Sequence, residues 1–364
     1  MGLVDELLSA TPVIGAADLQ SDLGISSGTY AWVVFAIPTL ASAALEAGIL
    51  AWSDRASPGA VLFWALLALA GTELAIASAT GPVSLSAAVS AWFIASGVCT
   101  GVAMGQLAAK SAGDMAASLQ RWGQASELGD LLGPVLFGAL ASVGIGWRGL
   151  ALCGAVAAAL NALAVRAVPE EVPVEDDEPD PAPLLEVARA ALADRVLLGW
   201  LLASACCTFL DEILVAWGGL FLRQEVGLDG RGEAVQLAAA SVGGLLGSAL
   251  VERCVGRFGA RRCFVAMSGV CAAALVTWVH FPTVPWIALV GASAAPMWPL
   301  AQAMAYARLP GRPGLVAALD KLTFPIELAA PLIVGWVAAT WGPGAAVMAL
   351  AVQPVVVAVV ALLT

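Results

Sequence analysis

Eleven long apolar stretches, separated by short polar turns, dominate this sequence. Each is about 20 residues or longer, the length that a helix needs to cross the hydrocarbon core of a bilayer. Backbone N–H and C=O groups find no water in lipid, so spans of this composition must be helices. The sequence therefore predicts an all-α membrane protein. The stretches lie at approximately 29–52, 58–80, 83–108, 123–145, 148–166, 195–222, 234–252, 262–280, 284–307, 315–340 and 344–363.

Composition excludes several classes of protein. The 364 residues are 60% hydrophobic and 12% charged, which leaves room for about twelve spans and no large soluble domain. A net charge of -11 without a basic patch excludes nucleic-acid binding. We find no GxxxxGK[ST] motif for ATP, no catalytic constellation and no metal-ligand spacing, and we expect the seven cysteines to be core residues. We therefore expect neither an enzyme nor a cofactor.

An acidic, proline-rich stretch divides the apolar runs into two sets. The segment from Val168 to Ala182 contains PEEVPVEDDEPDPA, which can neither pack nor insert and is expected to be solvated. We predict an N-terminal transmembrane half (1–167, helices 1–6), a linker (168–190) and a C-terminal half (191–364, helices 7–12).

Basic residues predict the orientation, because loops on the cytoplasmic side are enriched in Lys and Arg. Thirteen of the sixteen fall on the side of the linker and the C-terminus, which we therefore expect to be cytoplasmic. The other side has only Arg148, Arg223 and Arg231. We expect a multi-pass protein, monomeric, in the plasma (inner) membrane.

The two sets of spans repeat one another in the same chain order. Asp5-Glu6 is echoed by Asp211-Glu212, GILAWSDR from Gly48 by GSALVER from Gly247, and Asp130 with Gly133-Pro134 by Glu327 with Ala330-Pro331. Such duplication is frequent in transporters. It predicts two six-helix halves related by a pseudo-two-fold axis along the membrane normal. It also predicts a truncated first helix, because the N-terminal piece from Met1 to about Leu19 lacks a counterpart of the residues that precede Asp211.

With this repeat, the chain resembles the major facilitator superfamily over essentially its whole length. The family's loop motif between its second and third helices matches Gly48, Asp54 and Arg55, although Ala56 to Gly59 replace the usual Gly-Arg-Arg. The resemblance implies a conformational latch between the halves. Its residues here are Gly48, Asp54, Arg55, Gly247, Glu252, Arg253, Arg257 and Arg261.

A second motif resembles the fifth-helix signature of antiporters in that family. It consists of Gly129, Gly133, Pro134 and Gly138, with Phe137 where the family has glycine. Small residues let a helix approach its neighbour closely, so packing is an alternative explanation of the motif.

Eight carboxylates are predicted at membrane depth, where a charge costs about 2.5–3.5 kcal/mol on insertion scales. No lysine or arginine lies well inside a span to balance them, so several should be protonated near neutral pH. The pairs Asp5/Glu6 and Asp211/Glu212 are the first candidates for substrate and proton coupling, followed by Asp130 and Glu327, with Trp217 on the same helix as Asp211. Glu46 and Glu73 are weaker candidates.

These acids favour a secondary transporter that exchanges protons for a small-molecule substrate by alternating access. The first hypothesis is proton-coupled export of cationic or amphipathic small molecules. A divalent metal exporter is the second, and a lipid-handling or non-transporting relative is the third. An anion importer is disfavoured because no buried cation could hold the substrate.

Overall fold

The computed structural model describes residues 2–53, 56–110, 115–167, 184–309, 316 and 319–364. Helices account for the regular structure of this part, and no strand occurs in it. The first half contains α1 (Gly2–Ile14), α2 (Ala16–Leu23), α3 (Ser27–Tyr30), the π-helix η1 (Ala31–Ala36), α4 (Ile37–Ser53), α5 (Pro58–Ala77), α6 (Pro82–Lys110), α7 (Met115–Ser142) and α8 (Gly146–Ala167).

The second half follows the predicted linker. Residues 168–183 lie outside the described part, and α9 begins within the predicted 168–190 linker, whose boundaries stay a prediction. The elements are α9 (Leu184–Ala193), α10 (Arg195–Cys207), the 3-10 helix η2 (Thr208–Leu210), α11 (Glu212–Gln224), α12 (Gly230–Phe258), α13 (Ala260–His280), α14 (Val284–Ala294), α15 (Met297–Tyr306), the 3-10 helix η3 (Lys321–Thr323), α17 (Phe324–Trp341), α18 (Pro343–Leu350) and α19 (Val352–Leu363).

Ten helices in the described part are long and apolar enough to cross a membrane. The two further spans of the bundle, α1–α2 and α7, are not among them. α1 and α2 are only 13 and 8 residues long, and α7 carries Arg121, Glu127 and Asp130 within its length.

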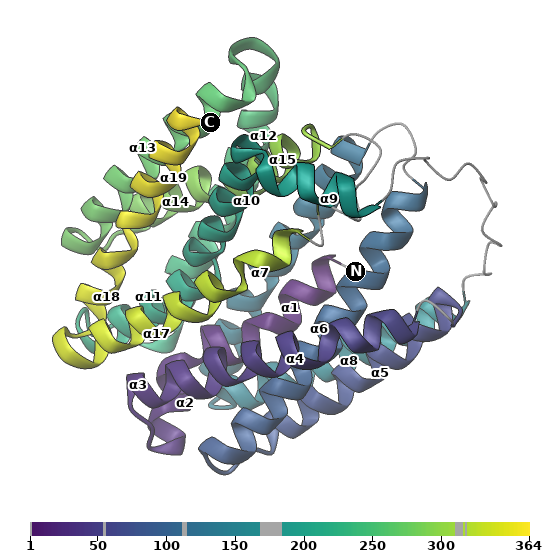
Figure 1. Cartoon of the computed structure of the whole chain (residues 1–364). Coiled ribbons are helices and arrows are strands. Elements are labelled where there is room, and N and C mark those ends of the chain that lie inside the picture. Colours follow the sequence, from purple (N-terminus) through teal and green to yellow (C-terminus); the bar gives the residue numbers. More distant parts are fainter. Residues whose placement is uncertain (1, 54–55, 111–114, 168–183, 310–315, 317–318) are drawn as a thin grey trace.

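Equivalent helices pack together in each half, as the predicted repeat requires. The second span of each half packs on the fourth, as α4 on α6 and α12 on α14, and the third packs on the sixth, as α5 on α8 and α13 on α19. Figure 1 shows the first half, purple to blue, beside the second half, teal to yellow. The helical fold in two six-span halves is confirmed.

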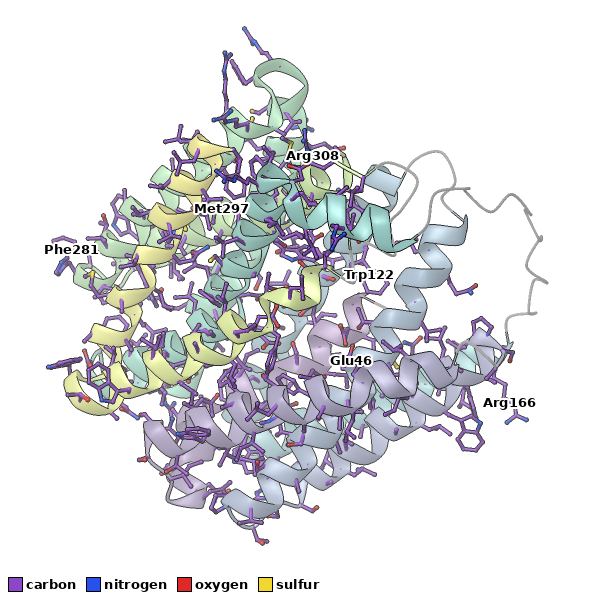
Figure 2. The ribbon with its side chains drawn as sticks, in the orientation of Figure 1. Glu46, Trp122, Arg166, Phe281, Met297 and Arg308 are labelled. Atoms are coloured by element: carbon purple, nitrogen blue, oxygen red, sulfur yellow. The ribbon has the colours of Figure 1, made fainter. Side chains whose placement is uncertain are left out.

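The bundle has two distinguishable ends. We call the end where α8 stops at Ala167 and α10 starts at Arg195 the linker end, and the end with the turns at Gly24 and Gly227 the loop end. Figure 2 marks Arg166 and Arg308 at the linker end and Phe281 at the loop end. Short turns connect the antiparallel helices; at Gly259, for example, a positive φ of 84° favours glycine.

The first span differs from its counterpart in the second half. α1 begins at Gly2, three residues before Asp5, whereas α10 begins at Arg195, sixteen before Asp211. The amino-terminal end of α1 lies in the middle of the bundle in Figure 1, beside α6 and α7. The predicted truncation of the first helix stays a prediction.

At the linker end, the described ion pair stays within one half. Asp194 accepts a 2.7 Å hydrogen bond from Arg308 and caps α10 through the backbone N–H groups of Val196 and Leu197. Burial is the largest single contribution and raises the pKa of the Asp194 carboxyl group, but the hydrogen bonds and the charge of Arg308 together outweigh it, so this pKa is lowered. This ion pair therefore connects the residues just after α15 to the start of α10.

Glycines allow α12 and α14 to approach closely. A Cβ atom added at Gly243 or Gly247 would collide with the carbonyl oxygen of Ala288 or Ala292, and one added at Gly291 would collide with that of Ala240. A backbone atom cannot move aside as a flexible side chain can. This contact therefore depends on glycine at all three positions.

We expect Gly243→Ala to destabilise the protein by about 1–3 kcal/mol, because the added methyl group overpacks the α12–α14 contact. Gly256→Ala on the same helix is the matched control, since its Cβ would meet nothing within 4 Å. The control should match or slightly exceed wild-type stability, because alanine favours helix over glycine. Thermal unfolding in detergent measures both, and equal shifts would refute the packing argument.

Candidate functional site

The seventh span is interrupted at the depth of the predicted site. α10 ends at Cys207, η2 follows, and Asp211 has the non-helical angles φ -109° and ψ -110° before α11 begins. The side chain of Asp211 is exposed although the residue lies in the middle of the seventh span, Arg195–Gln224. Irregular backbone at membrane depth is tolerated where it lines a water-filled cavity. Asp211 therefore combines an irregular backbone with an exposed side chain at the depth of the predicted site.

Six carboxylates lie close enough for their charges to interact. They come from α1 and α7 of the first half and from the break and first turn of α11 in the second. Among the described residues, no lysine or arginine side chain belongs to the group. We call this set the central acidic group: Asp5, Glu6, Glu127, Asp130, Asp211 and Glu212.

Five of these six carboxylates were predicted from the sequence. Glu127 was not among the predicted residues, although it lies inside the predicted span 123–145. Its spacing of three residues from Asp130 puts both on one face of α7, and this spacing is the signal that could have identified it. A Cβ atom at Gly244 of α12 would lie 2.5 Å from the Glu127 carboxylate, so Glu127 touches the other half.

The members of the central acidic group differ in their partners. Asp5 accepts hydrogen bonds from Ser96 at 2.6 Å and Thr100 at 3.1 Å, both on α6. In the part of the chain that is described, the Asp211 carboxylate has no hydrogen-bond partner. Asp5 is thus fixed to its own half by two side chains of α6, whereas no described side chain fixes Asp211 in this way.

Four other predicted residues lie apart from the central acidic group. Glu327 is exposed on α17 and accepts a 3.2 Å hydrogen bond from Thr323. Glu46 accepts a 2.6 Å hydrogen bond from Ser42 and packs against α6. Glu73 is 0% exposed between α1, α5, α6 and α8. Trp217, also 0% exposed, contacts aromatic rings instead of the acids.

The glycines of the antiporter-like motif are contact points of α7. A Cβ atom at Gly129 would collide with the carbonyl oxygen of Leu3 on α1, and one at Gly138 would lie 2.8 Å from the Cβ of Ala234 on α12. Pro134 lies inside α7 between them. Close packing of this helix against both halves accounts for the glycines at these two positions.

The predicted latch residues are only partly described. Asp54 and Arg55 lie outside the described residues, and Gly48 faces open space. In the second copy, Glu252 and Arg253 are exposed. Arg257 lies over the ring of Phe258, and Arg261 donates a 2.6 Å hydrogen bond to the Leu362 carbonyl of its own half.

An ion pair joins the halves at the loop end. Arg223 of α11 binds Asp18 of α2 at 2.7 Å and lies 3.8 Å from Glu233 of α12, which is 1% exposed. The neighbouring pair, Arg148 with Asp22 at 2.9 Å, stays within the first half. The ion pair of Arg223 with Asp18 therefore links α2 to the second half.

Aromatic rings close the same end beneath this ion pair. The rings of Tyr30 and Phe35, from the second span, lie 5.7 Å and 5.4 Å from that of Trp217 on α11. The hydroxyl of Tyr30 donates a 2.6 Å hydrogen bond to the Pro12 carbonyl. Together with the close approach of α17 to η1, these contacts seal the loop end.

No site for a metal ion is formed among the described residues. No group of three or more His, Cys, Asp or Glu side chains there has a suitable geometry, although carboxylates are numerous. All seven cysteines are free and buried or half-buried. The described carboxylates therefore do not converge on one point as metal ligands do.

We expect Asp18→Asn to weaken the closed loop end, because it removes the charge that pairs with Arg223 across the halves. A partly exposed pair contributes about 1 kcal/mol or less, which corresponds to a roughly fivefold change in population. Backbone hydrogen exchange of α2 and α11 should accelerate accordingly. Asp22→Asn on the same helix is the control and should leave α11 unchanged; equal effects of both substitutions would refute a role in joining the halves.

Comparison with solved structures supports the same architecture. A bacterial homolog of the human lysosomal transporter Spinster, in an inward-facing and unoccupied conformation, superposes with a TM-score of 0.74 at 17% identity, covering 100% of this chain and 94% of that one. The nucleoside transporter NupG gives 0.73 at 12% identity, with 100% and 96% covered. The human organic anion transporter MFSD10 gives 0.65 at 15%, with 99% and 97% covered. At these identities the likeness concerns the fold alone.

Sequence comparison identifies the family directly. No curated protein matches this sequence. The profile of the Major Facilitator Superfamily, however, matches residues 7–324, which is most of the chain. The match includes both halves and every described span from α1 to the start of α17. The protein therefore belongs to the Major Facilitator Superfamily, as a multi-pass membrane transporter that works by alternating access and not as an enzyme.

Proposed function

We propose that this transporter exports cationic or amphipathic small molecules in exchange for protons. The observation that carries the proposal is the central acidic group, in which both halves bring carboxylates close enough for their charges to interact, without a lysine or arginine among the described residues. A cationic substrate would supply the missing positive charge. A substrate anion would meet only repulsion.

Competition for one carboxylate couples the two fluxes in this proposal. A cation enters from the linker end, which the distribution of basic residues favours as the cytoplasmic end, and binds Asp211 in its charged form. Opening of the loop end then exposes the carboxylate to the other side. A proton replaces the cation there, and the neutral carboxyl group returns with the reverse transition.

The interrupted seventh span supports Asp211 as the exchanging group. Its side chain is exposed within the bundle and has no hydrogen-bond partner in the described structure, whereas Asp5 is held by two hydroxyl groups. We infer that Asp5 and Asp130 contribute negative charge to the surroundings of Asp211. Asp211 and Glu212 are the carboxylates that the second half contributes to substrate binding.

We expect Asp211→Asn to abolish coupled transport, because asparagine can neither carry the compensating charge nor take up the proton. Losing one charged hydrogen bond of about 1.5–3 kcal/mol lowers substrate binding roughly tenfold or more. Proteoliposomes with an internal pH indicator would be challenged with a panel of organic cations. Wild-type protein should respond with a proton flux that is absent from the variant.

Glu73→Gln is the matched control, because Glu73 is also an acid at membrane depth but is fully buried away from the central acidic group. It should retain transport. An Asp211→Asn protein that transports like wild type would refute the proposal. Flux evoked by divalent metals and by no organic cation would instead favour a metal exporter.

A further inference from the structure

A groove lies on the surface between the two halves, where α7 and α12 pack against each other. It has a volume of about 370 Å³, within the roughly 300–1,000 Å³ range of small-molecule sites. Apolar and small side chains form its walls. They are Val135, Gly138 and Ala139 of α7 with Ala234, Val235 and Ala238 of α12.

The groove opens toward the lipid and not toward the central acidic group. The inner faces of the same two helices are occupied, since Phe137 and Leu237 pack with Ile14 and Leu150 in one buried cluster. Val135 and Val235, by contrast, are 51% and 54% exposed. Further exposed apolar residues continue this outer face along both helices. In a bilayer such a face meets acyl chains.

Arg231 gives the groove a charged end. It lies in the first turn of α12, at the loop end, and is exposed. Arg148 and Arg223, the other arginines of this end, have the carboxylate partners Asp22 and Asp18. Arg231 has no carboxylate partner within the described part of the chain. Ser142 of α7, which also lines the groove, adds a hydroxyl group beside it.

We propose that this groove binds an anionic phospholipid. One acyl chain lies along the small residues where Gly138 meets Ala234, and the phosphate group lies at Arg231, at the level of the headgroups. An apolar floor with a single cation at its polar end matches an amphipathic anion. The zwitterionic lipid of equal chain length fits the floor but gains less from Arg231.

The site would favour one conformation of the transporter. Its two walls belong to different halves, and both lie on the loop-end side of Glu127 and Ser241, where α7 and α12 also touch. A lipid seated in the groove contacts both walls while the loop end is closed. Movement of α7 away from α12 at that end would divide the site, so bound lipid stabilises the closed loop end.

Native mass spectrometry of the full-length, delipidated protein in detergent tests the proposal, with phosphatidylglycerol and phosphatidylcholine of identical chains as probes. Wild type should bind phosphatidylglycerol at least fivefold more tightly. Arg231→Gln should abolish this preference. Arg262→Gln, which changes an exposed arginine at the linker end that is not among the predicted latch residues, should preserve it.

A second variant tests the groove itself. Ala139 is exposed, so Ala139→Trp can fill the groove without disturbing the buried cluster, and it should reduce the binding of both lipids at least fivefold. Persistence of the phosphatidylglycerol preference in Arg231→Gln would overturn the proposal. So would unchanged lipid binding in Ala139→Trp.

Discussion

Electrostatic repulsion among six carboxylates at membrane depth is the constraint on which the rest of this structure depends. A charge without a partner is costly in hydrocarbon, so such a group needs water, protons or cations around it. The hydroxyl groups of Ser96 and Thr100 donate hydrogen bonds to the Asp5 carboxylate. The irregular backbone at Asp211 leaves that side chain exposed. The helices that carry the acids, α1, α7 and α11, therefore surround the middle of the bundle.

Alternating access requires that one end of the bundle be closed while the other is open. The contacts of Arg223 with Asp18 and of Trp217 with Tyr30 and Phe35 close the loop end, and they cross from one half to the other. Each is weak enough to break, because the ion pair is partly exposed and the aromatic contacts contribute about 0.5–1.5 kcal/mol each beyond burial. A transporter that alternates between two states needs closures of this strength.

Prediction from the sequence succeeded where the residues act locally. The apolar runs located most of the spans within a few residues, whereas α7 begins eight residues before its predicted start. Prediction was less informative where the surroundings of a side chain depend on packing with neighbouring helices. Trp217 was predicted near the substrate because it follows Asp211 on the same span, and the structure packs it on Tyr30 at the closed end. Glu127 was missed because its surroundings depend on how α7 packs against α12.

The sequence by itself determined that the chain is a duplicated helical bundle in lipid, because hydropathy and the demand for internal backbone hydrogen bonds leave no other solution. It also determined which spans carry acids. Only the tertiary structure decided which acids face one another, that Glu73 is isolated while Asp211 is exposed, and which end is closed. The reason is physical: helix composition sets whether a residue enters the membrane, whereas the rotation and contacts of twelve packed helices set what its side chain meets.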